Sequence, residues 1–172
     1  MNIKKTDIEN ILSEILSGRE DRVRIRDAHL SENVFACQIT LNIPGYPKLI
    51  PNDERAVESV SKAFIEKWTS CPISKKKITN AAGVCWVGFF EGDITAAKKA
   101  KEIAVSIEEG IPEGRIFDID IIVQIKTISR SDLGLPPRTC LLCGRPAKEC
   151  ARDRSHSYEE LRTAIEKLIK NI

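Results

Sequence analysis

The sequence has no long apolar run and no apolar leader at its start. None of its segments reaches the roughly 18 apolar residues that a membrane-spanning helix needs, so we expect no membrane partner. Residues 1–14 are amphipathic and charged, unlike the apolar core of a secretory signal. These two absences together predict a cytoplasmic protein.

An excess of either charge is also missing. The chain carries 27 Lys and Arg against 25 Asp and Glu, a net charge of +2, so its overall charge does not favour nucleic acid as a partner. An anion site would have to come from local clustering of Lys and Arg. The 42% hydrophobic and 30% charged residues are typical of a globular protein, and the length predicts a single domain over residues 1–172.

Histidine is scarce, with two residues, and cysteine is the more informative type, with six. In a chain without a secretory signal, reduced thiols or metal ligands are expected before disulfides. Three of these cysteines and a histidine form the pattern Cys-x2-Cys-x6-Cys-x5-His, at Cys140, Cys143, Cys150 and His156. This spacing supplies four ligands for a tetrahedral Zn²⁺ site, and the alternative is a loop of packed, reduced thiols.

Hydrophobic periodicity predicts four helices and four strands. A helix over 6–16 would begin with a capping box of Thr6 and Glu9 and end at Gly18, and Asp53 would cap a second helix reaching residue 68. The other predicted elements are helices at 94–107 and from Ser157 onward, and strands at 35–43, 73–79, 84–90 and 116–125. Between the terminal helices the order is β-α-β-β-α-β. The prediction is an α+β fold with a ferredoxin-like core, extra N- and C-terminal helices and a Cys- and Arg-rich C-terminal segment.

The last predicted strand carries two acidic residues, Asp118 and Asp120, in an otherwise apolar run. Alternate side chains of a strand share a face, so the two carboxylates could bind one Mg²⁺ ion. A ferredoxin-like sheet pairs this strand with the first one, which would bring Asn42 and the turn at Gly45 near Asp118. If the helices cover the apolar face, the acidic face is open and is a natural floor for an active site. The alternative is that both residues are only the wetted side of an amphipathic strand.

Basic residues gather around the cysteines and the last strand. Arginine forks suit phosphate oxygens, and this group contains Arg115, Arg130, Arg138, Arg145, Lys148, Arg152 and Arg154. A second basic stretch, with Arg19, Arg22, Arg24 and Arg26, could bind anions or only face solvent.

Two stretches carry a family resemblance: GRIFDID at 114–120 and ISRSDLGLPPRTCLLCGRPAKECARDRSHS at 128–157. The chain here closely resembles the CitX family, the holo-acyl-carrier-protein synthases of citrate lyase. ITLNIPG at 39–45, with Lys48 after it, and GREDR at 18–22 resemble two further parts of the family. The sequence departs from the family in having no glycine after the Asp-x-Asp strand, so we expect the hairpin to turn around Lys126 and Thr127.

The resemblance implies a nucleotidyltransferase-type reaction. The donor would be 2'-(5''-triphosphoribosyl)-3'-dephospho-CoA, the acceptor a serine of the citrate lyase acyl carrier protein (gamma subunit), and pyrophosphate would leave. The residues would be Asp118, Asp120 and Arg115 for catalysis with Mg²⁺ on the two aspartates, and Asn42, Gly45, Lys48, Arg130, Arg138, Arg152 and Arg154 for the substrate.

Two alternatives stay open. One is a related transferase for another carrier, such as that of a malonate decarboxylase. The other is a non-enzymatic, zinc-containing module that binds nucleic acid. RNA binders of this topology stack bases on exposed aromatic residues of the sheet, whereas Phe35 and Phe117 are predicted on its apolar face.

Overall fold

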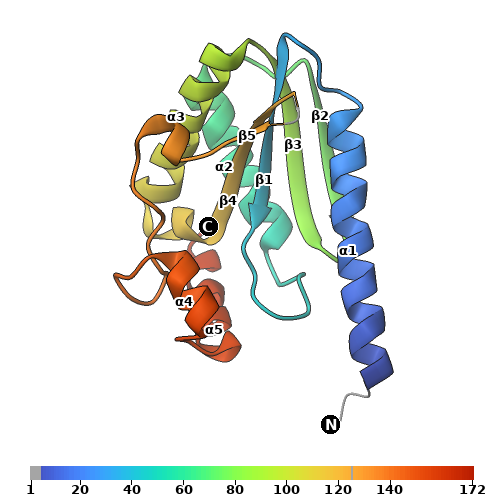
Figure 1. Cartoon of the computed structure of the whole chain (residues 1–172), viewed down its shortest axis with the longest axis vertical. Helices are drawn as coiled ribbons and strands as arrows, with labels where there is room; N and C mark the ends of the chain where they lie inside the picture. The colour runs from blue at the N-terminus through green and yellow to red at the C-terminus, as the bar shows by residue number, and fades with distance from the viewer. Residues whose placement is uncertain (1–4, 125) are drawn as a thin grey trace.

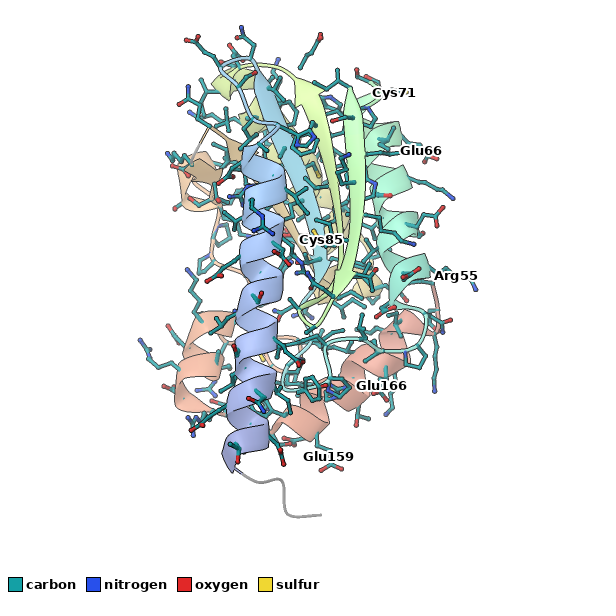
Figure 2. The ribbon with its side chains drawn as sticks, turned by 90° about the vertical axis from the view of Figure 1, so that its right-hand side faces the viewer. Arg55, Glu66, Cys71, Cys85, Glu159 and Glu166 are labelled. Carbon is teal, nitrogen blue, oxygen red and sulfur yellow. The ribbon has the colours of Figure 1, made fainter. Side chains whose placement is uncertain are left out.

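A five-stranded antiparallel sheet, in the order β2-β3-β1-β4-β5, forms the centre of the computed structural model, which describes residues 5–124 and 126–172. Helices α2 and α3 cover one face of the sheet and α1 crosses the other, while α4 and α5 pack at one end (Figures 1 and 2). The strands are β1 (Val34–Leu41), β2 (Ser74–Asn80), β3 (Gly83–Glu91), β4 (Phe117–Val123) and β5 (Lys126–Ile128). The helices are α1 (Lys5–Asp27), α2 (Asp53–Trp68), α3 (Ile94–Gly110), α4 (Ala147–Asp153) and α5 (Tyr158–Ile169), with 3-10 turns η1 (Pro112–Ile116) and η2 (Ser131–Leu133).

The pairing of the first and last predicted strands is confirmed. Strands β1 and β4 run antiparallel, with Thr40 opposite Asp118 and Gln38 opposite Asp120. The strand predicted at 73–79 is β2, which lies at one edge of the sheet. Strand β5 and helix α4 were not predicted, since both are short and lie in segments with little apolar periodicity.

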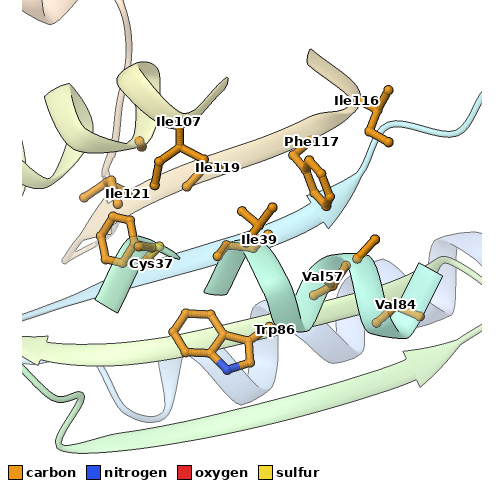
Figure 3. Close-up of a cluster of buried hydrophobic side chains, with 14 of the residues drawn as sticks. Cys37, Ile39, Val57, Val84, Trp86, Ile107, Ile116, Phe117, Ile119 and Ile121 are labelled. Carbon is orange, nitrogen blue, oxygen red and sulfur yellow. The ribbon is translucent and has the colours of Figure 1, made fainter. Parts of the chain in front are cut away.

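The main core fills the space between the sheet and helices α2 and α3. Alternating residues of β1 and β4 point into it, among them Cys37, Ile39, Ile119 and Ile121, all fully buried (Figure 3). Helix α2 contributes Val57, which is also fully buried. Burial of such side chains contributes roughly 1.5–3 kcal/mol each, and it fixes which residues of β4 face the other side.

The predicted end of the first helix at Gly18 is wrong, because α1 continues to Asp27. Gly18 instead packs directly against Asn80 of β2: a Cβ there would lie 2.7 Å from Asn80 Oδ1, and Asn80 Nδ2 donates to the Gly18 carbonyl at 3.0 Å. The predicted capping box is also wrong, since Thr6 lies within the helix. Of the predicted apolar face, Ile15 is buried, whereas Leu12 and Leu16 are exposed.

Three further details concern turns and caps. The hairpin turns before the predicted Lys126 and Thr127, which already pair with β4; Gln124 takes a positive φ of 53° in place of a glycine. The predicted strand end at Ile125 lies outside the described residues. Asp53 is the first residue of α2 rather than its cap, and its carboxylate accepts from the amides of Ile50 and Glu54. The capping box that starts α5, Ser157 with Glu160, is confirmed.

The outer edge of β4 is closed by two charged side chains of α3. Strand β5 pairs only with Ile121, Ile122 and Val123. The amide of Ile119 donates to Glu108 Oε1 at 2.9 Å, and Lys101 Nζ donates to the Ile119 carbonyl at 2.7 Å. Both side chains are buried, and they satisfy backbone groups that would otherwise lose their partners.

Among the described residues, no helix combines the length and the apolar composition that a membrane span requires.

Gly114 in η1 lies directly against the last turn of α3, which generates a prediction. A Cβ at Gly114 would lie 2.1 Å from the Ile107 carbonyl oxygen, a backbone atom that cannot move aside. We expect Gly114→Ala to lower the free energy of unfolding by about 1–3 kcal/mol in urea titrations. Gly110→Ala is the matched control, because a Cβ at Gly110 meets no atom within 4 Å. It should leave stability unchanged or raise it by up to about 1 kcal/mol. Equal midpoints for the two variants would contradict this packing.

Candidate functional site

The two aspartates of β4 lie on the face of the sheet opposite α2 and α3, as predicted, next to Thr40 and Gln38 of β1. The prediction that this face is open is wrong. Helix α1 runs across it (Figure 2), held partly by Arg22, whose guanidinium donates to the Gly83 carbonyl at 2.7 Å. Asp118 and Asp120 are therefore half-buried, and the Asp118 side chain keeps 44% of its surface exposed.

The environments of the two carboxylates differ. Burial raises the pKa of Asp118, and the neighbouring Arg138 opposes that shift. Arg138 Nη1 donates to Asp118 Oδ1 at 2.5 Å. Burial also raises the pKa of Asp120, with Lys101 lowering it and Asp118 raising it further. Among the described residues, no side chain hydrogen-bonds to the Asp120 carboxylate, so its negative charge is only partly balanced.

A pocket of about 280 Å³ opens between α1, β1 and β4, and we term it the basic pocket. Its cations are Arg19 and Arg22 of α1 and Lys48 of the loop after β1; Asp118 forms part of its wall. Lys48 Nζ donates to the Ile43 carbonyl at 2.5 Å, and burial lowers the pKa of Lys48. The pocket thus combines three cationic side chains with one carboxylate, a set that suits a phosphate group together with a metal ion.

A second pocket, of about 720 Å³, lies at the end of the sheet beside α4 and α5, and we term it the large pocket. Arg115, Arg138 and Arg154 line it together with apolar side chains such as Leu161 and Ile165. Asn42 lines both pockets. Because Arg138 lines the large pocket and is bonded to Asp118, which lines the basic pocket, the two pockets meet at this ion pair.

Two of the predicted substrate residues, Arg130 and Arg152, lie outside both pockets. Arg130 pairs with Glu108 at 2.9 Å and with Glu109, and it lines neither pocket. Arg152 has a side chain that is 77% exposed, lies beside Asp153 and also lines neither pocket. The structure therefore brings Asn42, Lys48, Arg115, Arg138 and Arg154 to the two pockets, and it leaves Arg130 and Arg152 outside. Gly45 sits near Tyr158, a residue of the large pocket.

The predicted zinc ligands are brought together. The ligand atoms of Cys140, Cys143, Cys150 and His156 all lie within 4.8 Å of one another. This cluster borders the large pocket, since Cys140, Cys150 and His156 line it.

The sequence left Arg19 and Arg22 open between anion binding and a solvent-facing role, and it placed Gln38 and Thr40 on the polar face of the first strand without a binding role; all four line the basic pocket. The sequence did contain a pattern that could have placed Arg19 and Arg22 together. Residues three apart share a face of a helix, so extending the first helix beyond Gly18 would have aligned Arg19 with Arg22. For Gln38 and Thr40, alternation on β1 predicts their side of the sheet but not a pocket.

Comparison with known proteins gives a consistent family. The sequence pattern described as "CitX: Apo-citrate lyase phosphoribosyl-dephospho-CoA transferase" matches residues 10–172. A Streptococcus pyogenes protein named "Probable apo-citrate lyase phosphoribosyl-dephospho-CoA transferase" is 32% identical over 168 residues, covering 92% of this chain and 84% of its own length. A Vibrio cholerae protein with the same name is 31% identical, with 94% and 93% covered. "Protein CitXG" of Leuconostoc mesenteroides is 29% identical and matches over 35% of its length, with 93% of this chain covered.

The partly balanced charge of Asp120 predicts a gain in stability on its removal. Because burial raises its pKa in the folded state, this carboxyl favours folding below its unfolded-state pKa of about 3.9, and the contribution is lost as pH rises through the folded-state pKa. Without divalent cations, Asp120→Asn should therefore stabilise the fold at pH 7 by an amount on the order of 1 kcal/mol. The gain should shrink toward pH 4 in thermal melts.

Asp118→Asn is the matched comparison, because it also removes the charge partner of Arg138 and should gain less. An Asp120→Asn variant that is less stable than the wild type at both pH values would contradict the electrostatic argument.

Proposed function

Because the chain belongs to the CitX family of apo-citrate lyase phosphoribosyl-dephospho-CoA transferases, we propose that it attaches this prosthetic group to the citrate lyase acyl carrier protein. The donor is 2'-(5''-triphosphoribosyl)-3'-dephospho-CoA and the acceptor is a serine hydroxyl of the carrier, the gamma subunit. The products are the modified carrier, joined through a phosphodiester, and pyrophosphate.

One observation carries this proposal: the basic pocket and the large pocket meet at Asp118 and Arg138. The donor has two chemically distinct halves, a triphosphate and a nucleotide with a long pantetheine arm. The basic pocket, with Arg19, Arg22 and Lys48, has the charge to take the triphosphate. The larger and more apolar pocket has the size to take part of the dephospho-CoA, with Arg115 and Arg154 facing its remaining phosphates.

Asp118 and Asp120 fit a divalent cation such as Mg²⁺. They are oxygen donors on one face of one strand, burial disfavours their charges, and Asp120 has no hydrogen-bonding side chain around it in the described chain. Arg138 occupies only Oδ1 of Asp118 and leaves the other oxygen available. A bound Mg²⁺ ion would neutralise charge on the triphosphate and on the leaving pyrophosphate.

Side chains of the protein position the substrates and accept the proton. Transfer to phosphorus depends on in-line positioning and charge stabilisation more than on covalent catalysis. The serine oxygen forms a bond to the α-phosphorus, the bond from that phosphorus to the pyrophosphate oxygen breaks, and the serine proton passes to a nearby carboxylate. The nearby carboxylates are Asp118, which lines the basic pocket, and Asp120, which lies on the same face of β4. Arg19 and Lys48 hold the leaving group, and Arg138 fixes the position of Asp118.

Two finer points belong to the same proposal. The order β2-β3-β1-β4 with α2 and α3 on one face supports a ferredoxin-like core, extended by β5. The aromatic residues of the sheet, such as Phe35, Phe89 and Phe117, are buried, which gives the alternative of a nucleic-acid-binding module no stacking surface. The cytoplasmic location stays a prediction from the sequence.

The direct test incubates the full chain with Mg²⁺, the triphosphorylated donor and the apo form of the carrier, and measures the intact mass of the carrier. The wild type should add one prosthetic group and release one pyrophosphate. Asp118→Asn and Asp120→Asn should each reduce the rate at least about 100-fold, because charge stabilisation at phosphorus is lost. Asp21→Asn, a charge removal on α1 outside both pockets, should leave the rate unchanged.

Full activity of both aspartate variants would refute the carboxylate assignment. A wild-type chain that modifies only the carrier of a malonate decarboxylase would refute the choice of acceptor.

The basic pocket generates a separate prediction about donor affinity. Lys48→Ala should raise the KM for the donor about tenfold or more, because a charge-assisted bond to phosphate contributes about 1.5–3 kcal/mol. Lys62→Ala is the control, since Lys62 is an exposed residue of α2 that pairs with Glu58 at 2.9 Å. An unchanged KM in Lys48→Ala would place the triphosphate outside this pocket.

A further inference from the structure

The segment between β5 and α5 folds without an apolar core of its own. In the described chain between Ile128 and Ile165, the only buried apolar side chains are Cys140 and Cys150, each 5% exposed. Yet residues 138–157, which we term the cysteine segment, form a defined wall of the large pocket. Ordering each residue costs roughly 1–2 kcal/mol of backbone entropy, so this wall needs another source of stability.

The backbone of the cysteine segment is shaped as a ligand scaffold. Thr139 bridges to Pro146, the Cys140 amide donates to the Arg145 carbonyl at 2.7 Å, and the Ala147 amide donates to the Arg138 carbonyl at 2.8 Å. These bonds close a tight hairpin that carries Cys140 and Cys143. Helix α4 follows directly and presents Cys150, and the turn before α5 presents His156. The ligands therefore come from three consecutive elements that converge on one point.

The distances among the ligand atoms agree with one small ion. Cys143 Sγ lies 3.4 Å from Cys150 Sγ and 3.4 Å from His156 Nε2, and the four ligand atoms lie within 4.8 Å of one another. Ligands at about 2.3 Å from a tetrahedral Zn²⁺ ion are separated by about 3.8 Å. Coordination would move the pairs at 3.4 Å apart by a few tenths of an ångström and bring atoms as far apart as 4.8 Å closer by about 1 Å.

The charges around the cluster fit as well. Three thiolates and a neutral imidazole around Zn²⁺ leave a net charge of −1. The guanidinium of Arg145 interacts with both Cys143 and Cys150 and can balance that charge. Arg115 of η1 donates to the Cys140 carbonyl and so ties the hairpin to η1. Hydrogen bonds and ionic contacts that neighbouring residues make to metal ligands commonly orient those ligands.

We propose that Cys140, Cys143, Cys150 and His156 bind one structural Zn²⁺ ion that holds the cysteine segment in place. Four protein ligands fill a tetrahedral coordination shell and leave no open position, so the ion does no chemistry on the substrate. Its role is to fix the hairpin that begins at Arg138 and forms part of the large pocket. The proposal goes beyond the transfer reaction and does not depend on it.

The test is metal content, measured by plasma mass spectrometry on the full chain purified without a histidine tag from zinc-supplemented medium. About one Zn²⁺ per chain is expected, without the visible absorption of an iron–sulfur cluster. His156→Ala should lose most of the zinc, whereas His156→Cys should retain it, because a four-cysteine site also binds Zn²⁺. Cys71→Ser, at an exposed cysteine outside the cluster, is the control and should keep the full content.

Removal of zinc by a chelator should lower the melting temperature by roughly 10 °C, and adding Zn²⁺ back should restore it. Folded wild-type protein with less than about 0.1 zinc per chain would overturn the proposal, and so would a mass deficit of two hydrogens showing a Cys143–Cys150 disulfide. A chain that binds zinc but transfers nothing to the carrier would overturn only the proposed function.

Discussion

A buried carboxylate, Glu108 of α3, joins three parts of the molecule. Its side chain is 5% exposed, accepts from the Ile119 amide at 2.9 Å, and pairs with Arg130 at 2.9 Å and with Arg138 at 3.1 Å. A buried charge of this kind is tolerated only while its partners are present, because an unpaired charge in the interior costs several kcal/mol. Arg138 in turn reaches Asp118 and begins the cysteine segment. The geometry of the site therefore depends on a buried carboxylate of α3 at the outer edge of β4.

Much of the fold was predictable because it rests on local periodicity. Strand β1 alternates between apolar and polar residues, α5 begins at a complete capping box, and the pairing of β1 with β4 follows from the order of elements. The length of α1 was not predictable in this way. Glycine normally marks a helix end, but Gly18 is required by the contact with Asn80, which lies 62 residues away in the sequence. In the sequence, a glycine that is required by a tertiary contact looks the same as a glycine that ends a helix.

The site was predictable where it depends on strand alternation and ligand spacing. Asp118 and Asp120 share a face because they are two residues apart on a strand, and the cysteines converge with His156 as their spacing suggests. The sequence could not assign a role to each arginine. Within a cluster of arginines, the sequence does not distinguish a guanidinium that binds phosphate from one that pairs with a glutamate. Arg130 and Arg138 both pair with Glu108, yet only Arg138 also reaches Asp118 and lines a pocket. That difference depends on the path of the chain after β5, which places Arg138 but not Arg130 beside Asp118.

The position of Asn42 has a consequence for selectivity. The backbone amide of Asn42 donates to the Ile116 carbonyl at 2.9 Å, which anchors the residue just beyond the end of β1. Asn42 lines both pockets. The separation between the two pockets is therefore set in part by the backbone that joins the end of β1 to the start of β4. Under the proposed function, this spacing selects a bound molecule by its length. Inorganic triphosphate or coenzyme A alone would then occupy only one of the two pockets, and only a longer molecule would occupy both.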